Sequence, residues 1–375
     1  MKIAIEAQRI FRPNKHGMDF VALEAIRCLQ QIDRENEYFI LVSPGEDQCL
    51  EASDNVHIIE VKGPTYPVWE QIALPRAVAR IRPDLLHCTS NTASIWKSCP
   101  LVLTLHDIIF LEPRETSSPS LYQNMGWYYR RFVVPRILPK CEKIITVSHF
   151  ECNRIRTALQ LPEDKITAIY NGYSRHFRPV SHPELVTSKY ISSPGYFFFL
   201  ANTDPKKNTP RTLKAYRLYL QRSAVKRPLL LGDLKQEYFD KMLKEHALED
   251  LRPWLHLSGY IPNTDLPSIY SGAFAFLYTS LRESFGIPLL EGMASGTPVI
   301  TSDTSSMPEV AGRQAILTDP TDEESIATQM LRLELDPVFY NAQVAYGLER
   351  VKLFSWEQTA RKLLALYQRV VADKH

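Results

Sequence analysis

The chain has 375 residues, which is too long for one ordinary hydrophobic core and fits two domains. Its 44 basic and 42 acidic side chains leave a formal charge of +2, so the composition carries no electrostatic footprint for nucleic acid. The six cysteines are scattered without a Cys-x-x-Cys pair, which predicts reduced thiols and neither a disulfide framework nor a zinc site.

The first residues, MKIAIE, do not form a signal peptide, because the apolar run is short and interrupted by a charge. No apolar stretch approaches the length that spans a bilayer. We therefore expect a cytoplasmic protein that is either soluble or peripheral at the inner face of the cytoplasmic membrane.

Short apolar runs rich in β-branched and aromatic residues recur along the chain, and most are continuous instead of alternating. Such runs are typical of strands buried on both faces of a parallel sheet. In chain order they are KIAIEA, YFILVS, VHIIEV, PLVLTLHD, KIITVS, ITAIY, YFFFLA, PLLLG, AFAFLYTS, TPVITSD and AILTD. Helical periodicity separates them, for example at 20–31, 69–81 and 210–222, and predicts a last helix at 356–371. The alternation predicts a doubly wound α/β fold.

The series of strands and helices runs twice. The first series ends near ITAIYNGYSRHFRPV and the second begins at Tyr196, while the polar segment 181–195 between them has the composition of a linker. We expect an N-terminal Rossmann-like domain at 1–180, onto which the final helix at 355–375 packs back, and a C-terminal one at 190–354. Because ligands bind at the carboxyl ends of parallel strands, the two domains should face a central cleft.

The stretch RESFGIPLLEGMASGTPVITS places Glu283 and Glu291 eight positions apart, around a Phe-Gly turn. Pro288 suits a first helical turn and Gly296 suits a helix end, so the helix should be short, roughly 287–295. Its N-terminal N–H groups would favour an anion such as a diphosphate. Two carboxylates beside that anion need neutral donors, and sugar hydroxyls are such donors. The alternative is that both glutamates are solvated charges at a helix end.

A second polar patch follows a buried strand in FFFLANTDPKKN. Lys206 and Lys207 lie there at the start of the next predicted helix. A cation at this place can neutralise the charge that builds on a departing diphosphate. The alternative is a pair of solvated lysines in a turn.

The N-terminal half offers weaker candidates. His106 and Asp107 end a buried strand in LVLTLHD, and His87 ends another in PDLLHC, although a histidine at a strand end is more often structural than catalytic. The loop RPNKHGMD contains one glycine, Gly17, and is no G-x-G-x-x-G fingerprint, so a dinucleotide cofactor is disfavoured.

The stretch LYQNMGWYYRRFVVPRILPK, at 121–140, mixes aromatic with basic residues and contains no acid. A basic, aromatic helix face is suited to anionic lipid or to a lipid-linked acceptor. A core helix with arginines at its rim is an equally good interpretation.

The segment around Glu283 and Glu291 resembles the E-x7-E motif of the retaining glycosyltransferases of family 4, which have the GT-B fold. Other segments also resemble the family, and together they cover nearly the whole chain, most specifically 257–320. They are KIITVSHFECNRI, ITAIYNGYSRHF, LHLSGYIPNTDLPSIYSGA, SSMPEVAGRQAILTDP and FSWEQTARKLLALY.

The resemblance implies a role for each matched residue. Glu291 would hold the ribose hydroxyls of a nucleotide-sugar, and Glu283 the hydroxyls of the donor sugar. Lys207 would bind the diphosphate, and His106 would contact the donor sugar, oriented by Asp107. The remaining implied donor contacts are Gly17, Lys206, Tyr260, Ile261, Ser284, Phe285, Gly286 and Ile287. Relatives often carry an arginine where this chain has Asn202, so Asn202 or Thr203 would have to donate a hydrogen bond to the phosphate instead.

The resemblance further implies transfer of a hexose with retention, to a sugar or lipid-linked glycan acceptor in polysaccharide or lipopolysaccharide biosynthesis. The overall likeness leans toward the bacterial surface-polysaccharide, mannosyltransferase-like branch, which favours GDP-mannose over a UDP-sugar. Front-face return of the acceptor hydroxyl would need no metal and no cofactor beyond the nucleotide-sugar. A GT-B epimerase, a sugar phosphorylase or a non-catalytic two-lobed sugar-binding protein are the alternatives, and donor turnover with and without acceptor separates them.

Overall fold

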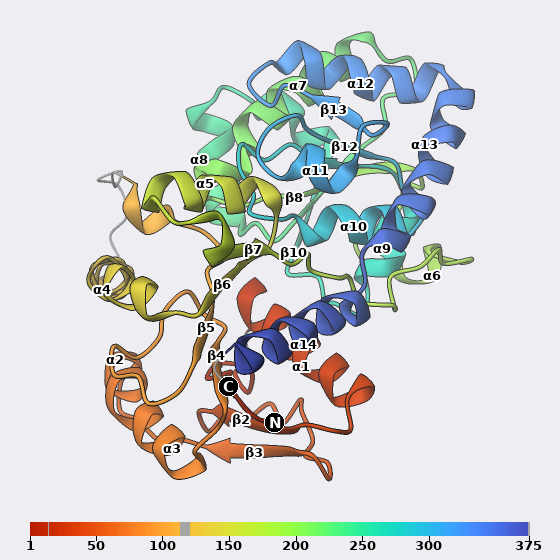
Figure 1. Cartoon of the computed structure of the whole chain (residues 1–375). Coiled ribbons are helices and arrows are strands. Elements are labelled where there is room, and N and C mark those ends of the chain that lie inside the picture. Colours follow the sequence, from red (N-terminus) through yellow and green to blue (C-terminus); the bar gives the residue numbers. More distant parts are fainter. Residues whose placement is uncertain (14, 113–120, 374–375) are drawn as a thin grey trace. The chain divides into compact units, whose positions relative to one another are not determined.

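The structure is a computed structural model that describes residues 1–13, 15–112 and 121–373 (Figure 1). The chain divides into two compact units, of which the first comprises Met1–Gly172 with Trp356–His375 and the second comprises Tyr173–Ser355. The polar segment at 181–195 belongs to the second unit and contains the short helix α6 (Glu184–Thr187).

The first unit is built on a seven-stranded sheet in the order β3-β2-β1-β4-β5-β6-β7. Every pairing in it is parallel. Its strands are β1 (Lys2–Glu6), β2 (Glu37–Val42), β3 (Val56–Glu60), β4 (Leu85–Cys88), β5 (Leu101–Thr104), β6 (Lys143–Thr146) and β7 (Ile166–Ala168). Successive side chains of β1 enter different cores, because Ile3 and Ile5 pack with one cluster of buried residues and Ala4 with another. The sheet is therefore covered on both faces, as its continuous apolar runs predict.

Helices cover the two faces of this sheet. The last helix, α14 (Trp356–Ala372), packs beside α1 (Gly17–Ile32) although the two lie at opposite ends of the chain (Figure 1). Both helices contribute to the same hydrophobic cluster. The other helical segments are α2 (Tyr66–Val68), η1 (Trp69–Ala73), α3 (Leu74–Ile81), η2 (Ile109–Leu111), α4 (Leu121–Ile137), η3 (Leu138–Lys140), α5 (His149–Leu159) and η4 (Glu163–Lys165).

The segment at 69–81, predicted as one helix, is divided in the structure. A π-helical turn, η1, precedes α3, and the N–H of Leu74 donates to the carbonyl of Trp69 five residues back. Pro75 follows directly and has no N–H, so the regular hydrogen-bond ladder is interrupted at this point. The side chain of Glu70, which the turn carries, is buried and accepts hydrogen bonds from Tyr66 and Thr92.

The second unit is built on a six-stranded parallel sheet in the order β10-β9-β8-β11-β12-β13. Its strands are β8 (Tyr196–Leu200), β9 (Leu229–Gly232), β10 (Leu255–Gly259), β11 (Ala273–Tyr278), β12 (Val299–Ser302) and β13 (Ile316–Thr318). Its other helical segments are η5 (Pro205–Lys207), α7 (Thr209–Arg222), α8 (Gln236–Glu245), η6 (Glu249–Trp254), α9 (Leu266–Gly272), α10 (Ile287–Ala294), α11 (Met307–Ala311), α12 (Glu323–Leu335), α13 (Pro337–Arg350) and η7 (Val351–Leu353).

The topology of the second sheet positions its polar loops. The chain leaves β8 toward β9 on one side and returns to β11 on the other, so the strand order reverses between β8 and β11. Ligands of doubly wound sheets bind at the carboxyl ends of the strands at such a reversal. The loop after β8 carries Lys207, and the loop after β11 carries Glu283. The expected fold, two doubly wound parallel sheets, is confirmed.

Candidate active site

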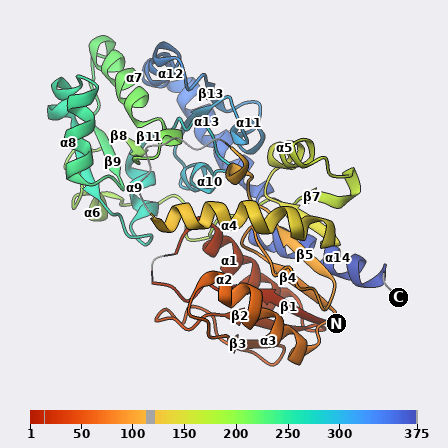
Figure 2. The same ribbon diagram turned by 90° about the vertical axis from the view of Figure 1, so that its left-hand side faces the viewer.

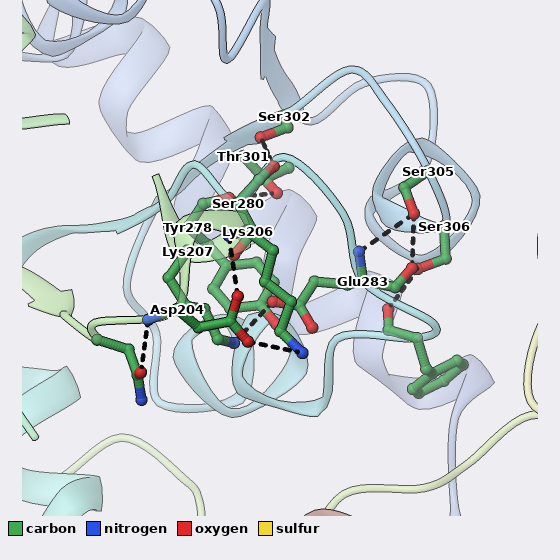
Figure 3. A network of polar contacts seen from close by, with 12 residues as sticks. Asp204, Lys206, Lys207, Tyr278, Ser280, Glu283, Thr301, Ser302, Ser305 and Ser306 are labelled. Carbon is green, nitrogen blue, oxygen red and sulfur yellow. Dashed lines mark hydrogen bonds and ion pairs between the residues drawn. The ribbon is translucent and has the colours of Figure 1, made fainter. Parts of the chain in front are cut away.

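The centre of the candidate site in the second unit is an ion pair between Lys207 and Glu283. The ammonium of Lys207, at the end of η5, lies 2.7 Å from Oε1 of Glu283 (Figure 3). Both side chains are mostly covered, with 24% and 14% of their surface exposed. The structure thus brings together two residues that are 76 positions apart in the sequence and that were selected from separate motifs.

The loop that carries Lys207 is fastened to the end of β11. The carboxylate of Asp204 accepts the N–H of Lys206, 3.1 Å away, and starts the η5 turn. The next residue, Asn208, is buried, has a left-handed φ of 61° and donates its amide to the carbonyls of Thr279 and Pro320. Asparagine tolerates this backbone conformation better than most residues. The hydrogen bonds from Asn208 therefore fix the position of the neighbouring Lys207 backbone relative to the end of β11.

The backbone around Glu283 is held by two serines at the start of α11. Ser305 accepts the N–H of Glu283 and donates to its carbonyl at 2.6 Å, and Ser306 donates to the same carbonyl at 2.8 Å (Figure 3). Ser306 also bonds the carbonyl of Phe285. A loop carbonyl that would otherwise lack partners is thereby satisfied, and the carboxylate is presented from a fixed backbone.

The turn between the two glutamates requires glycine at Gly286. This residue precedes α10 with φ +98° and ψ 56°, a left-handed conformation that side chains disfavour. A Cβ there would also lie 3.2 Å from the ring of Tyr278. The helix begins at Ile287, as predicted, and ends at Ala294, before Gly296 with its φ of +78°.

The second glutamate of the motif, Glu291, lies in α10 near the buried Tyr270. The Tyr270 hydroxyl donates to Oε2 of Glu291 at 3.3 Å. Burial raises the pKa of Glu291 from 4.5 to about 7, and the hydrogen bond from Tyr270 opposes this increase. The carboxyl group therefore titrates close to neutral pH.

The other donor contacts expected in the second unit differ in exposure. Tyr260 is 79% exposed, whereas Ile261 is buried. Phe285 is buried against Phe354, with ring centroids 5.9 Å apart, so only its backbone is available to a ligand. Ser284 and Ile287, beside it, are half-buried.

The residues expected to replace the missing arginine have local partners. The side-chain oxygen of Asn202 accepts the N–H of Asp204 at 3.0 Å, so the amide nitrogen is the group of this side chain that can donate to a ligand. Thr203 is exposed. The ammonium of Lys206 lies 3.5 Å from the Asp204 carboxylate, so its charge is partly balanced within the loop.

In the first unit, His106 follows β5 and is buried. Its Nε2 bonds the carbonyl oxygen of Thr89 at 3.0 Å, and its backbone N–H donates to Asn91. Burial lowers the pKa of His106, although the Thr89 carbonyl and the charge of Asp107 oppose the shift. The imidazole is therefore neutral at neutral pH. Asp107 was expected to orient the ring, but its carboxylate instead accepts the N–H of Ile109.

Two further candidates of the first unit have different surroundings. His87, in β4, is buried and bonds the hydroxyls of Tyr367 and Thr104 at 2.6 and 2.7 Å, and burial lowers its pKa to about 3. These contacts give His87 a structural role, because they join β4 to α14 and to β5. Gly17 is exposed at the start of α1, and a Cβ there would meet open space.

The aromatic and basic stretch forms α4, the long helix that Figure 2 shows in yellow. Its buried face consists of Val133, Val134 and Ile137, which pack in the hydrophobic core. Its other face exposes Met125, Tyr128 and Phe132, which are 61%, 66% and 54% exposed. Arginine side chains lie over aromatic rings of this helix, Arg131 over Trp127 and Arg136 over Phe132. The core-helix interpretation thus describes the buried face, and contact of the exposed face with lipid stays a prediction.

Sequence reasoning missed four residues that build this site. They are Tyr270, Tyr278, Ser305 and Ser306, which hold the two glutamates and the loop between them. Their positions in the sequence follow no recognisable motif, so the sequence alone does not predict that these serines and tyrosines contact the glutamates.

Within residues 1–13, 15–112 and 121–373, no three His, Cys, Asp or Glu side chains are grouped so that they could hold a metal ion. In the same part of the chain, no helix is both long and apolar enough to cross a membrane. The expectation that the reaction needs no metal remains a prediction.

Comparisons with known proteins agree with this architecture. Residues 16–176 match the model of Glycosyltransferase Family 4, and residues 188–350 match that of Glycosyl transferases group 1. O-antigen chain mannosyltransferase B of Escherichia coli is 30% identical over 270 residues, which cover 71% of this chain and 70% of the relative. The serotype-specific mannosyltransferase WbdA of Escherichia coli is 25% identical over 80% of this chain, which spans only 38% of that protein.

Among solved structures, sucrose-phosphate synthase from Thermosynechococcus elongatus superposes with a TM-score of 0.78 at 20% identity, and the match covers 99% of each chain. A likeness at this identity supports the GT-B fold alone. The family models and the 30% identical relative go further. The chain belongs to the group 1, family 4 glycosyltransferases, and the expectation of a glycosyltransferase enzyme is confirmed.

Proposed function

We propose that this glycosyltransferase transfers mannose from GDP-mannose, with retention at the anomeric carbon, to a sugar or lipid-linked glycan acceptor in surface-polysaccharide biosynthesis. The observation that carries the proposal is the Lys207–Glu283 pair, 2.7 Å apart beside the reversal of strand order in the second sheet. The choice of mannose is supported by the mannosyltransferase that is 30% identical to this chain.

In this proposal Lys207 stabilises the leaving group. An ammonium has three N–H donors, so Lys207 can keep its bond to Glu283 and also donate to a diphosphate oxygen. The bond between the anomeric carbon and the diphosphate oxygen breaks, and negative charge collects on that oxygen beside the lysine. The N-terminus of α10, which begins four residues after Glu283, adds a favourable partial positive charge.

Glu283 binds hydroxyls of the donor sugar and does not attack its anomeric carbon. A carboxylate that is paired with an ammonium at 2.7 Å is a weak nucleophile, which disfavours a double displacement. The acceptor hydroxyl instead attacks the oxocarbenium-like centre from the side that the diphosphate leaves. Its proton passes to the departing phosphate oxygen, and Glu291 holds the ribose throughout.

The proposal is tested by replacing Lys207 with Met and Glu283 with Gln. Each variant should retain its cooperative unfolding transition and lose transfer by at least about a hundredfold, since one group that stabilises developing charge is worth roughly 10²–10³ in rate. Lys241→Met is the matched control, because Lys241 forms an exposed ion pair with Glu245 within α8. The assay measures release of GDP from GDP-mannose with and without a membrane fraction that supplies lipid-linked acceptors.

The two rival functions give different outcomes in that assay. A GT-B epimerase would turn over a nucleotide-sugar without any acceptor, and a sugar-binding protein would not turn it over at all. A Lys207→Met enzyme with wild-type activity contradicts the proposal whatever the donor is. Running the assay with UDP-, ADP- and dTDP-sugars in parallel tests the choice of GDP-mannose separately.

We further propose that the exposed face of α4 rests on anionic lipid at the inner face of the cytoplasmic membrane. Tyr128 and Phe132 lie one turn apart on this face, and Arg131 and Arg136 flank them. Aromatic rings suit the headgroup region and arginines attract acidic lipids, so the two kinds of residue reinforce one another. The protein should sediment with phosphatidylglycerol vesicles and not with phosphatidylcholine vesicles.

The variants Phe132→Ser and Arg136→Gln should each reduce that sedimentation several-fold, while Lys241→Gln should leave it unchanged. Equal sedimentation of wild type and both α4 variants would reject membrane contact through this helix. The transfer activity of the variants toward a water-soluble acceptor should be unaffected, which separates the membrane proposal from the catalytic one.

A further inference from the structure

Each glutamate of the candidate site has a buried tyrosine beneath it. Tyr278 is the last residue of β11 and lies under Glu283, while Tyr270 is in α9 and lies under Glu291. The two tyrosines are 4% and 0% exposed, respectively. Tyrosine hydroxyls this deep in a protein normally serve a specific hydrogen-bond partner.

Tyr278 touches three parts of the site at once (Figure 3). Its ring lies 5.7 Å from the ammonium of Lys207, as measured to the ring centroid, and only 3.2 Å from where a Cβ on Gly286 would stand. Its pKa is raised well above the ordinary value, first by burial and then by the charge of Glu283 and a hydrogen bond to it. One side chain thus fixes the carboxylate, the ammonium and the turn before α10 relative to one another.

Tyr270 has a narrower role. Its hydroxyl donates to Oε2 of Glu291 at 3.3 Å. Its ring is packed edge to face against Phe198 and Phe276, with ring centroids 5.2 and 5.0 Å away. This packing restricts the side chain and so fixes the position of the hydroxyl. Its carbonyl accepts the hydroxyl of Thr297, which follows the end of α10.

We propose that Tyr278 and Tyr270 are positioning residues, which hold Glu283 and Glu291 in the rotamers that bind the donor sugar and the ribose. This inference rests on the proposed function. A carboxylate has lone pairs for several hydrogen bonds, so the tyrosine on Oε2 of Glu291 leaves Oε1 to accept a substrate hydroxyl. A side chain that is already fixed loses less entropy when the substrate binds.

The two tyrosines should have separable kinetic effects. Tyr278 lies next to Lys207 and Glu283, which are proposed to stabilise the leaving group and to hold the reacting sugar, so Tyr278→Phe should lower kcat by about ten- to a hundredfold and change donor KM little. Of the two glutamates, Tyr270 contacts only Glu291, which is proposed to bind the ribose. Tyr270→Phe should therefore raise donor KM by about tenfold and leave kcat nearly unchanged. General loosening of the core would instead lower kcat and raise donor KM in both variants.

The experiment measures kcat and donor KM for the two variants, together with the affinity for the free nucleoside diphosphate by calorimetry. Tyr216→Phe is the matched control, since Tyr216 is equally buried in the same unit and donates to the carbonyl of Arg227. The control should lose stability without a specific kinetic effect. Tyr270→Phe should weaken nucleoside diphosphate binding about tenfold, and Tyr278→Phe should not change it.

A double-mutant cycle completes the test. The loss of diphosphate affinity caused by Tyr270→Phe should disappear when Glu291 is already Gln, because the two side chains act through one bond. Additive losses, or a fall of kcat and a rise of KM in both tyrosine variants alike, would overturn the inference. If the wild type binds a nucleoside diphosphate but transfers no sugar, the proposed function fails while the Tyr270 cycle still decides the role of that tyrosine.

Discussion

Gly286→Ala is the substitution that probes the geometry of the site most simply. The residue has a φ of +98°, and a Cβ there would stand 3.2 Å from the ring of Tyr278. Gly296→Ala is its matched control at the other end of α10, where φ is +78° and the nearest atom, in Pro179, is at an ordinary distance of 3.4 Å. Both variants carry backbone strain, and only the first presses on the site.

The magnitudes follow from these two distances. An alanine in the left-handed region costs about 1–2 kcal/mol, which applies to both variants. Crowding the Tyr278 ring by a few tenths of an ångström adds roughly 1 kcal/mol or more to Gly286→Ala alone. Because the same ring lies beneath Lys207 and Glu283, its displacement should also lower kcat/KM, on the order of tenfold or more.

The assay combines urea unfolding with steady-state kinetics on the two variants and the wild type. Gly286→Ala should lose both stability and kcat/KM, and Gly296→Ala should lose stability with kcat/KM nearly intact. Full kcat/KM in a Gly286→Ala protein that has lost at least as much stability as Gly296→Ala would refute the idea that the Gly286 turn and the Tyr278 ring fix the geometry of the site.

Four further predictions test contacts in the site and in the first unit. Burial raises the pKa of Glu291 to about 7 in the folded protein, so the unfolded chain binds fewer protons between about pH 4.5 and 7. The free energy of unfolding of the wild type should therefore fall as the pH rises through that range, relative to Glu291→Gln. Urea unfolding at several pH values measures this difference. Nucleoside diphosphate affinity should rise as the pH passes about 7 and should lose this dependence in Glu291→Gln. Ser306→Ala removes the hydroxyl that donates to the Phe285 carbonyl and one of the two hydroxyls that donate to the Glu283 carbonyl, and it should lower the free energy of unfolding by about 1–3 kcal/mol. Tyr367→Phe removes the bond between α14 and His87, so amide exchange in α14 should accelerate while exchange in α10 stays the same.

Much of the architecture could be predicted because buried parallel strands have a strong sequence pattern. Runs such as YFFFLA and AFAFLYTS are apolar on both faces, and the structure has β8 and β11 there. Helix ends were also readable, since Pro288 and Gly296 mark the two ends of α10. The π-helical turn η1 was not predicted, because Glu70 in that turn is buried partly by Thr92, which lies 22 positions further along the chain.

Only part of the candidate site could be predicted from the sequence, because some of its residues lie in no recognisable motif. Glu283, Glu291 and Lys207 lie in motifs with recognisable spacing, and the contact between Lys207 and Glu283 follows once the two loops meet at the reversal of strand order. The tyrosines beneath the glutamates are ordinary members of apolar runs, so only their three-dimensional neighbours reveal them. His87 is a histidine at a strand end, and its hydrogen bonds to Tyr367 and Thr104 are likewise revealed only by its three-dimensional neighbours.

The most direct test of the donor site is a calorimetric titration of nucleoside diphosphates into wild-type protein and Lys207→Met. One of GDP, UDP, ADP and dTDP should bind the wild type, with GDP the expected one, and Lys207→Met should bind the same diphosphate at least about tenfold more weakly, since a charge-assisted hydrogen bond contributes roughly 1.5–3 kcal/mol. Equal affinity in the two proteins would contradict the assignment of Lys207 to the diphosphate, and with it the central claim.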